Sequence, residues 1–291
     1  MKTIGYFALS LTLFCGLPSS ASYKVYEADL SESEWVFSGN PLGCQLRHSV
    51  PHYGDAIFRE GAGKNRTLQF VLNYKRQPIT ATKVASVQSL SPLWQPTQRP
   101  RNLGEIAISP GPQIFKAADI ASWKLLNELE VGRFPTFRYQ EFETLEDQVA
   151  VSLSAVGFKK SYDEFLDCLS SLVNHNLNEL TKMTLHFDFD KHAVRSSYKS
   201  KLAALAAYVK YDSNIDVVFI HGHTDSKGSK GYNRLLAEKR IQSVKKILMA
   251  HGAEEKRFKT IAFGEANPIA SNRRSNGRAK NRRVFIRVAQ K

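Results

Sequence analysis

Residues 217–252 read VVFIHGHTDSKGSKGYNRLLAEKRIQSVKKILMAHG, and this stretch decides the fold of the C-terminal part of the chain. The apolar run Val217 to Ile220 predicts a buried strand. After a loop rich in glycine and serine, apolar residues recur at helical spacing and predict a helix over 232–250. Gly252 marks the end of that helix. The stretch therefore predicts a strand, a loop and a long helix.

The same kinds of pattern continue on both sides of this stretch. Apolar residues alternate over 183–189, which predicts a strand, and a helical stripe follows over 195–211. Two further strands are predicted at 258–263 and 284–288. The order β-α-β-α-β-β predicts a two-layer α/β domain in which helices pack on one sheet.

The preceding 150 residues predict a different architecture, with short strands between clusters of turn residues. A helix is predicted over 117–130, and a second over 161–173 with Ser161 as its N-cap and Glu164 as the capping-box partner. We expect a mostly antiparallel β domain, sandwich-like or barrel-like, with one or two helices. The apolar segments behind this prediction are Val36, Leu46, 57–58, 68–72, 107–108 and 149–151.

Together these patterns predict an α+β protein with a signal peptide at 1–21, an N-terminal domain at 22–176 and a C-terminal domain at 177–291. Lys2, an apolar run and the small residues before Ser22 are typical of a secretory signal. We expect cleavage after Ala21 and a periplasmic protein. Cys15 raises the alternative of a lipoprotein, but bulky Phe14 precedes it where a small residue is needed.

Export leaves two cysteines, Cys44 and Cys168. An oxidising compartment favours a disulfide between such a pair, and two buried free thiols are the alternative.

The net charge of +14 is concentrated in the C-terminal part, where residues 178–291 contain 24 Lys and Arg against 10 Asp and Glu. Such a surplus favours nucleic acid, an anionic membrane or an anionic polymer as partner. The signal peptide argues against nucleic acid. A basic face that merely improves solubility is the plainer interpretation.

Several separated motifs in the C-terminal part resemble the OmpA-like peptidoglycan-binding family over residues 183–288. They are Phe187-Asp188-Phe189-Asp190-Lys191, Gly222-His223-Thr224-Asp225, Tyr232-Asn233-Arg234-Leu235-Leu236 with Arg240, Phe263-Gly264-Glu265-Ala266-Asn267-Pro268, and Gly277 to Val284. The resemblance implies a binding protein without catalytic activity, cofactor or metal. Its ligand is the stem peptide of peptidoglycan.

The diaminopimelate of a stem peptide ends in an ammonium and a carboxylate on one carbon, so recognition needs one anion and one cation close together. By resemblance, Asp225 takes the ammonium and Arg240 takes the carboxylate through its planar fork. Leu236 lies one turn before Arg240 and can line the same pocket. The resemblance also implicates Asn233, Phe187, Asp188, Arg278 and Asn281. For these, purely structural roles are nearly as favoured: Asn233 can cap its helix, and Arg278 can cover the loop before the last strand.

His221, His223 and Asp225 have the H-x-H-x-D spacing of a hydrolase metal site. Such a site needs further His or Asp ligands downstream, and His251 is the one histidine that follows. We therefore do not expect these residues to form a metal site, and we do not expect the protein to be an enzyme.

The N-terminal part resembles the T-ring proteins of the sodium-driven polar flagellar motor. The residues that carry this resemblance are Tyr26-Glu27-Ala28-Asp29-Leu30, Ser33-Glu34-Trp35, Cys44-Gln45-Leu46 and Ile57-Phe58. It implies a MotX-like T-ring protein and the flagellar basal body as partners, and indirectly the PomA–PomB stator. The alternative is a general envelope-stability protein that links peptidoglycan to another envelope protein.

Overall fold

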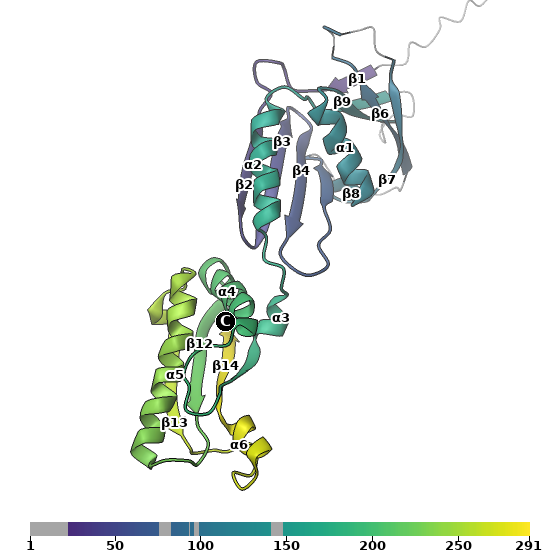
Figure 1. Cartoon of the computed structure of the whole chain (residues 1–291). Helices are drawn as coiled ribbons and strands as arrows, with labels where there is room; N and C mark the ends of the chain where they lie inside the picture. The colour runs from purple at the N-terminus through teal and green to yellow at the C-terminus, as the bar shows by residue number, and fades with distance from the viewer. Residues whose placement is uncertain (1–22, 76–82, 93, 96–98, 141–147) are drawn as a thin grey trace, which may run out of the picture.

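The computed structural model describes residues 23–75, 83–92, 94–95, 99–140 and 148–291. The predicted signal peptide and Cys15 lie outside these residues. Figure 1 shows two lobes, each built on a sheet of its own and joined by a short segment after residue 171. In the described part of the chain, no helix is long and apolar enough to cross a membrane.

The N-terminal sheet has ten strands in the order β1-β10-β9-β6-β7-β8-β5-β4-β3-β2. Its neighbouring strands are antiparallel except for the parallel pair β1 and β10, which confirms the mostly antiparallel prediction. They form one curled sheet (Figure 1). The strands are β1 (Tyr23–Tyr26), β2 (Trp35–Asn40), β3 (Gly43–Val50), β4 (Gly54–Gly61), β5 (Gln69–Asn73), β6 (Lys83–Leu90), β7 (Arg101–Ile108), β8 (Gln113–Ala118), β9 (Phe134–Gln140) and β10 (Gln148–Ser152).

Aromatic side chains fill the interior of the curl. The ring of Phe137 stacks on Phe115 at 4.9 Å and on Phe70 at 5.6 Å between centroids. The hydroxyls of Tyr53 and Tyr139 share a hydrogen bond of 2.9 Å inside this core. Because polar tips of buried aromatic residues need partners, this bond removes a desolvation cost from the core.

Helices α1 (Ile120–Glu130) and α2 (Phe158–Ser171) pack against this sheet. The predicted cap of the second helix is wrong. The helix begins at Phe158 after Gly157, whose φ of 73° is readily adopted by glycine. Ser161 lies inside the helix, and its hydroxyl donates to the carbonyl of Trp35 instead.

A disulfide joins Cys44 on β3 to Cys168 on α2, which confirms the predicted bridge. It fastens the helix to the second strand from one edge of the sheet, across 124 residues of sequence. Gly39 on β2 makes room for it, since a Cβ at that position would lie 2.6 Å from Sγ of Cys168.

The C-terminal sheet has four strands in the order β11-β14-β12-β13, and its elements follow the predicted β-α-β-α-β-β order. β12 pairs with β13 in parallel and with β14 in antiparallel fashion. Two short helices, α3 and α6, were not predicted. The elements are α3 (Leu177–Leu180), β11 (Lys182–His186), α4 (Ser196–Tyr211), β12 (Ile215–His223), α5 (Lys230–Ala250), η1 (Glu255–Arg257), β13 (Phe258–Gly264), α6 (Ser275–Asn281) and β14 (Arg283–Gln290).

Two turns of the N-terminal sheet hold the segment that leads to the second lobe. The amide of Val173 donates to the carbonyl of Pro41, and the amide of Gly63 donates to the carbonyl of Val173, both over 2.9 Å. Nζ of Lys64 lies 2.7 Å from the carboxylate of Glu179 on α3. The connecting segment is thus hydrogen-bonded to two turns of the N-terminal sheet.

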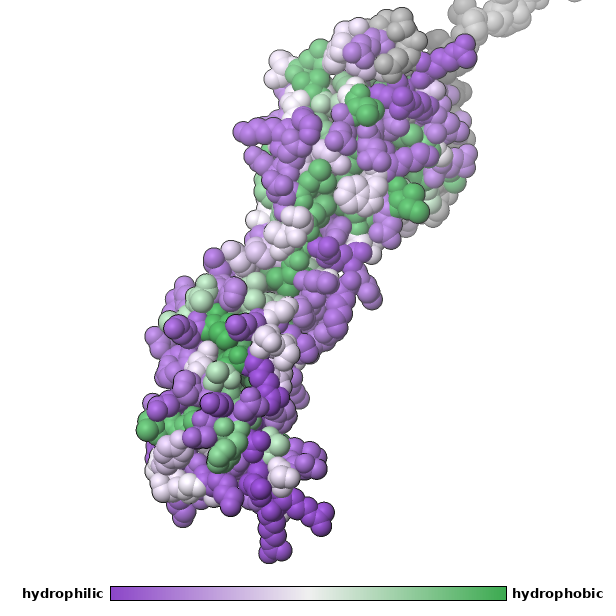
Figure 2. All heavy atoms as spheres, in the orientation of Figure 1, coloured by the Kyte–Doolittle hydropathy of each residue, from purple (hydrophilic) through white to green (hydrophobic). Residues whose placement is uncertain are grey.

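At the far end of the second lobe, near α6, strongly hydrophilic side chains project from the surface (Figure 2).

Candidate functional site

A pocket of about 200 Å³ opens where β12 ends and α5 begins. Four residues named from the sequence line it: Asp225, Arg240, Leu236 and Asn233. The complete lining is Phe189, Asp190, Thr224, Asp225, Lys227, Gly228, Tyr232, Asn233, Leu236, Arg240 and Arg282.

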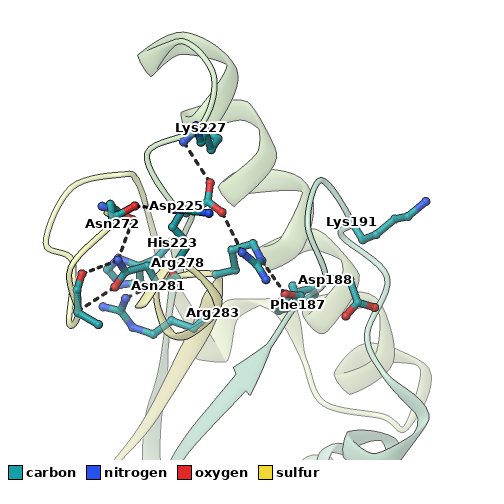
Figure 3. A network of polar contacts seen from close by, with 12 residues as sticks. Phe187, Asp188, Lys191, His223, Asp225, Lys227, Asn272, Arg278, Asn281 and Arg283 are labelled. Carbon is teal, nitrogen blue, oxygen red and sulfur yellow. Dashed lines mark hydrogen bonds and ion pairs between the residues drawn. The ribbon is translucent and has the colours of Figure 1, made fainter. Parts of the chain in front are cut away.

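Asp225 lies in the loop that follows β12, and it is only 3 % exposed. One carboxylate oxygen accepts from the backbone amide of Lys227 at 3.1 Å, a local bond that aspartate commonly makes in turns (Figure 3). The other accepts from Nη1 of Arg282 at 2.9 Å. The loop is also held by the amide of Thr224, which donates to the carbonyl of Gly264 over 2.7 Å. These bonds fix the carboxylate before any ligand arrives.

Arg240 projects from α5 and forms the floor of the pocket, with no exposed surface of its own. Its Nε donates to the carbonyl of Lys191 at 2.9 Å, and its Nη1 to the carbonyl of His223 at 2.8 Å. A weaker bond of 3.3 Å runs from Nη2 to the carbonyl of Asp188. A guanidinium has five N–H donors, so these contacts leave two for a ligand.

The charge of Arg240 survives its burial. Burial, and after it the positive charge of Arg282, lowers the pKa of Arg240 to about 10. The guanidinium therefore stays protonated at neutral pH. It also lies 5.1 Å from the ring centre of Phe187, a distance at which a cation is attracted to the ring face.

Asn233 and Leu236 lie on the face of α5 that borders the pocket. Asn233 does not cap its helix, because Ser229 occupies the N-cap and its hydroxyl accepts from the amide of Tyr232. The amide of Asn233 donates instead to Glu265 at 2.8 Å, which ties α5 to the loop after β13.

Phe187 and Asp188 support the pocket from outside its lining. Phe187 is 1 % exposed and belongs to the core beneath Arg240. Asp188 contributes its carbonyl to Arg240, while its exposed carboxylate pairs with Arg195. In Figure 3 the side chain of Lys191 points away from this network, although its carbonyl also accepts from Arg240.

Arg278 and Asn281 lie on α6, next to the pocket but outside its lining. Asn281 is fully buried, and its side chain bonds to backbone groups of Ile269 and Ala270 and to the side chain of Asn272 (Figure 3). Nη1 of Arg278 donates to the carbonyls of Asn272 and Arg273, both at 2.9 Å. Both side chains bond to the loop before α6.

The sequence prediction missed several residues of the pocket, and Arg282 is the most important. The sequence could not show that Arg282 pairs with Asp225, because the motif contains two adjacent arginines, Arg282 and Arg283. Thr224 was also missed: its buried hydroxyl has no hydrogen-bond partner among the described residues. A buried polar group without a partner is costly, so this hydroxyl is available to a ligand. Tyr232 bonds to Asp190 at the rim.

The histidines of the H-x-H-x-D pattern have other neighbours. Nε2 of His221 is buried without a partner, between the rings of Phe219, Phe263 and Phe285. The ring of His223 stacks on Phe263 at 5.0 Å. In the described residues, no group of three or more His, Cys, Asp or Glu side chains is placed to hold a metal ion.

Comparison with known proteins gives two family matches. Residues 26–173 match the MotY N-terminal domain, and residues 186–282 match the OmpA family. The sodium-type flagellar protein MotY of Vibrio parahaemolyticus is 33% identical over 284 residues, which cover 94% of each chain. Outer membrane porin F of Pseudomonas aeruginosa is 38% identical over 109 residues, 37% of this chain and 31% of the porin. The solved peptidoglycan-associated lipoprotein of Burkholderia pseudomallei matches 36% of this chain and 89% of its own, with 28% identity and a TM-score of 0.35.

Proposed function

This chain belongs to the MotY family, and we propose that it is a non-catalytic periplasmic adaptor of the flagellar motor that holds peptidoglycan in the pocket around Asp225 and Arg240. Its N-terminal part would hold partners in the motor, so that the two parts together help to anchor the stator. We place the boundary between the two parts at residues 176 and 177.

The observation that carries the proposal is the pairing of opposite charges in one small, pre-shaped pocket. Asp225 and Arg240 line the same space of about 200 Å³, and each is fixed by bonds to the protein. A carboxylate has roughly four acceptor positions, so Asp225 can take an ammonium beside its bond to Arg282. Two free N–H groups of Arg240 suit a carboxylate, and the hydroxyl of Thr224 supplies one more contact. Diaminopimelate offers both groups on one carbon.

Burial strengthens this recognition. Asp225 and Arg240 are almost fully enclosed, where charge-assisted hydrogen bonds are stronger than in water. Leu236 adds an apolar wall for the methylene chain of the ligand. The remaining candidate residues, Phe187, Asp188, Asn233, Arg278 and Asn281, act in this scheme by holding the pocket and its loops in place.

Sedimentation with purified sacculi tests the pocket. Asp225→Ala and Arg240→Ala should each abolish co-sedimentation, because each leaves one charged group of the ligand without its counterpart. Glu238→Ala, on the exposed side of α5, is the matched control. Undiminished binding by both pocket variants, with an intact circular dichroism spectrum, would refute the assignment.

For the N-terminal part, we propose a MotX-like T-ring protein and the flagellar basal body as direct partners, with the PomA–PomB stator as an indirect one. Membership of the MotY family supports this proposal. A pull-down from cells with the fragment 22–176 should recover these proteins. Recovery of an unrelated envelope protein instead would favour the general envelope-stability role.

A deletion strain separates the two roles at the level of the cell. Loss of swimming with normal resistance to detergent supports the motor adaptor. Normal swimming with a leaky envelope contradicts it. Complementation with the mature chain behind its own signal peptide, followed by mass measurement of the exported form, also tests periplasmic export and cleavage after Ala21.

A further inference from the structure

In the part of the chain that the structure describes, no helix packs on one face of the C-terminal sheet. Side chains of the opposite face, such as Ile220 and Ile286, are fully buried against α4 and α5. On the helix-free face, Ile261 is 48 % exposed, and Lys259 and Arg287 are exposed as well. We call this second surface the open face.

A row of cations crosses the open face from strand to strand. Lys182 on β11 is opposite Arg287 on β14, Arg287 is opposite Phe219 on β12, and Phe219 is opposite Lys259 on β13. With adjacent strands roughly 4.8 Å apart, the row spans about 14 Å. We call Lys182, Arg287 and Lys259 the cationic row.

Phe219 contacts the two cations on the strands beside it. The guanidinium of Arg287 lies 4.4 Å from the ring centre, and Nζ of Lys259 lies 6.0 Å from the same centre. Both distances are within the range of cation–π attraction. One ring therefore contacts two positive groups, one from each neighbouring strand.

The cationic row is unfavourable for folding as it stands. Like charges directly opposite each other on neighbouring strands destabilise a sheet, and Lys182 and Arg287 are such a pair. None of the three cations forms an ion pair with a carboxylate in the part of the chain that the structure describes. The next row along the strands, Thr184, Phe285, His221 and Ile261, contains no carboxylate either. The described chain therefore leaves the positive charge of this row to water, salt ions or a partner.

Three kinds of partner can be compared with the charge and exposure of the open face. A second copy of this surface is excluded by charge, because two cationic rows would face each other. A lipid surface fits poorly, because Ile261 is the one large apolar residue of the face, among those described, that is more than a third exposed. A linear row of exposed cations fits a polymer that carries repeated anionic groups.

We propose that the cationic row, backed by Phe219, is a second wall-contact surface that binds carboxylates of stem peptides other than the one held at Asp225 and Arg240. This proposal rests on the peptidoglycan function proposed above. Phe219 lies four residues before the end of β12 at His223, roughly 13 Å along the strand, and Asp225 lies beyond that end. One diaminopimelate group cannot reach both places, so the row must meet neighbouring stems. The pocket then supplies specificity, and the row adds attraction to the wall as a polyanion.

The test compares two triple variants of the full mature chain. Lys182→Gln, Arg287→Gln and Lys259→Gln together remove the cationic row. Lys199→Gln, Lys239→Gln and Lys246→Gln remove the same charge from exposed positions on α4 and α5. Binding to purified sacculi is measured at several salt concentrations, and binding of a soluble tripeptide stem ending in diaminopimelate is measured by calorimetry.

We expect the row variant to bind sacculi about five- to twentyfold more weakly at low salt, since each exposed ion pair contributes modestly. The difference should vanish near 1 M salt, where charges are screened within about 3 Å. Its affinity for the soluble tripeptide should equal that of the unmodified protein. That last result also separates the two proposals, because a failed pocket would lose the tripeptide whatever the row does.

Three outcomes would overturn the proposal. Equal sacculus binding by the row variant and the unmodified protein would remove the second contact. An equal loss in both triple variants would reduce it to overall charge. Loss of binding to phosphatidylglycerol vesicles without any loss on sacculi would assign the open face to a membrane.

Discussion

The guanidinium of Arg282 donates to the carboxylate of Asp225 over 2.9 Å, so the anion of the pocket already has a protein partner. Both side chains are mostly buried, with 16% and 5% of their surfaces exposed. The pair gives the buried carboxylate a cationic partner and holds it in place within the pocket.

A double-mutant cycle measures this pair. Arg282→Gln should lower the free energy of unfolding by about 1.5–3 kcal/mol, the usual contribution of a hydrogen bond to a charged group. Asp225→Asn in the same background should cost far less than it does alone, because the bond is already broken. Urea denaturation of the four proteins gives the coupling energy. Additive effects would mean that the pair contributes little.

Arg240 should not tolerate replacement by lysine. Arg240→Lys preserves the charge but loses the planar fork that contacts the carbonyls of Lys191 and His223 and still offers two donors. We expect affinity for a soluble diaminopimelate tripeptide to fall at least tenfold, which is about 1.4 kcal/mol. Calorimetry measures the loss, and Lys239→Arg on the exposed side of α5 is the control. Full affinity of the Arg240→Lys variant would show that a positive charge alone is enough to bind the carboxylate of the ligand.

Asn281 and Arg278 should differ in how much each stabilises the fold, and neither should contact the ligand directly. Asn281→Ala removes four hydrogen bonds at a fully buried position, so we expect about 2–4 kcal/mol of destabilisation. Arg278→Ala affects bonds at the rim of a loop and should cost less than about 1 kcal/mol. Thermal denaturation compares them. A strong loss of tripeptide affinity with unchanged stability in either variant would instead make that residue a direct contact.

The disulfide should stabilise the N-terminal part by constraining its unfolded state. Cys168→Ser should lower the free energy of unfolding by about 2–5 kcal/mol. Dithiothreitol should lower the stability of the unmodified protein similarly and leave the variant unchanged. If the reductant destabilised both proteins equally, the effect would not come from this bond.

Acid should weaken the C-terminal part through His223. Burial, and after it the charge of Arg283, lowers the pKa of His223 from 6.5 to about 4. The unfolded chain therefore binds the proton first, so stability is complete above pH 6.5 and falls as the pH drops towards 4. The loss from this group is roughly 2–3 kcal/mol. Urea denaturation of the unmodified protein and of His223→Phe at pH 7.5 and 4.5 should give a smaller pH effect in the variant.

The C-terminal fold was predictable because its signals are long and local. The strand at Val217 to Ile220 and the helix over 232–250 are each set by their own apolar pattern, and both fall within the observed β12 and α5. The N-terminal sheet was harder. Pro135 lies inside β9, where proline normally argues against a strand. The segment before α1, expected to be helical from residue 117, continues as β8 up to Ala118 because β5 pairs with it.

The pocket shows a similar division. Motif spacing pointed to Asp225 and Arg240 because each occupies a definite place on a loop or a helix. It could not choose between Arg282 and Arg283, whose side chains leave the start of β14 in different directions. Arg282 reaches Asp225, whereas Arg283 reaches the carbonyl of Asn267. The hydroxyl of Thr224 lacks a partner because of where the fold buries it, and sequence patterns do not show such burial.

The disulfide also decides how tension would travel through an anchored molecule. If the wall holds one end and the motor pulls the other, the load passes through the segment at Val173 and enters α2 at its C-terminal end. Cys168 lies less than two helical turns from that point, and its bond to Cys44 carries the load directly into β3, with strands hydrogen-bonded on both sides. The helix is thereby protected from being unwound turn by turn. The load would then be shared by the hydrogen bonds that join β3 to β2 and β4.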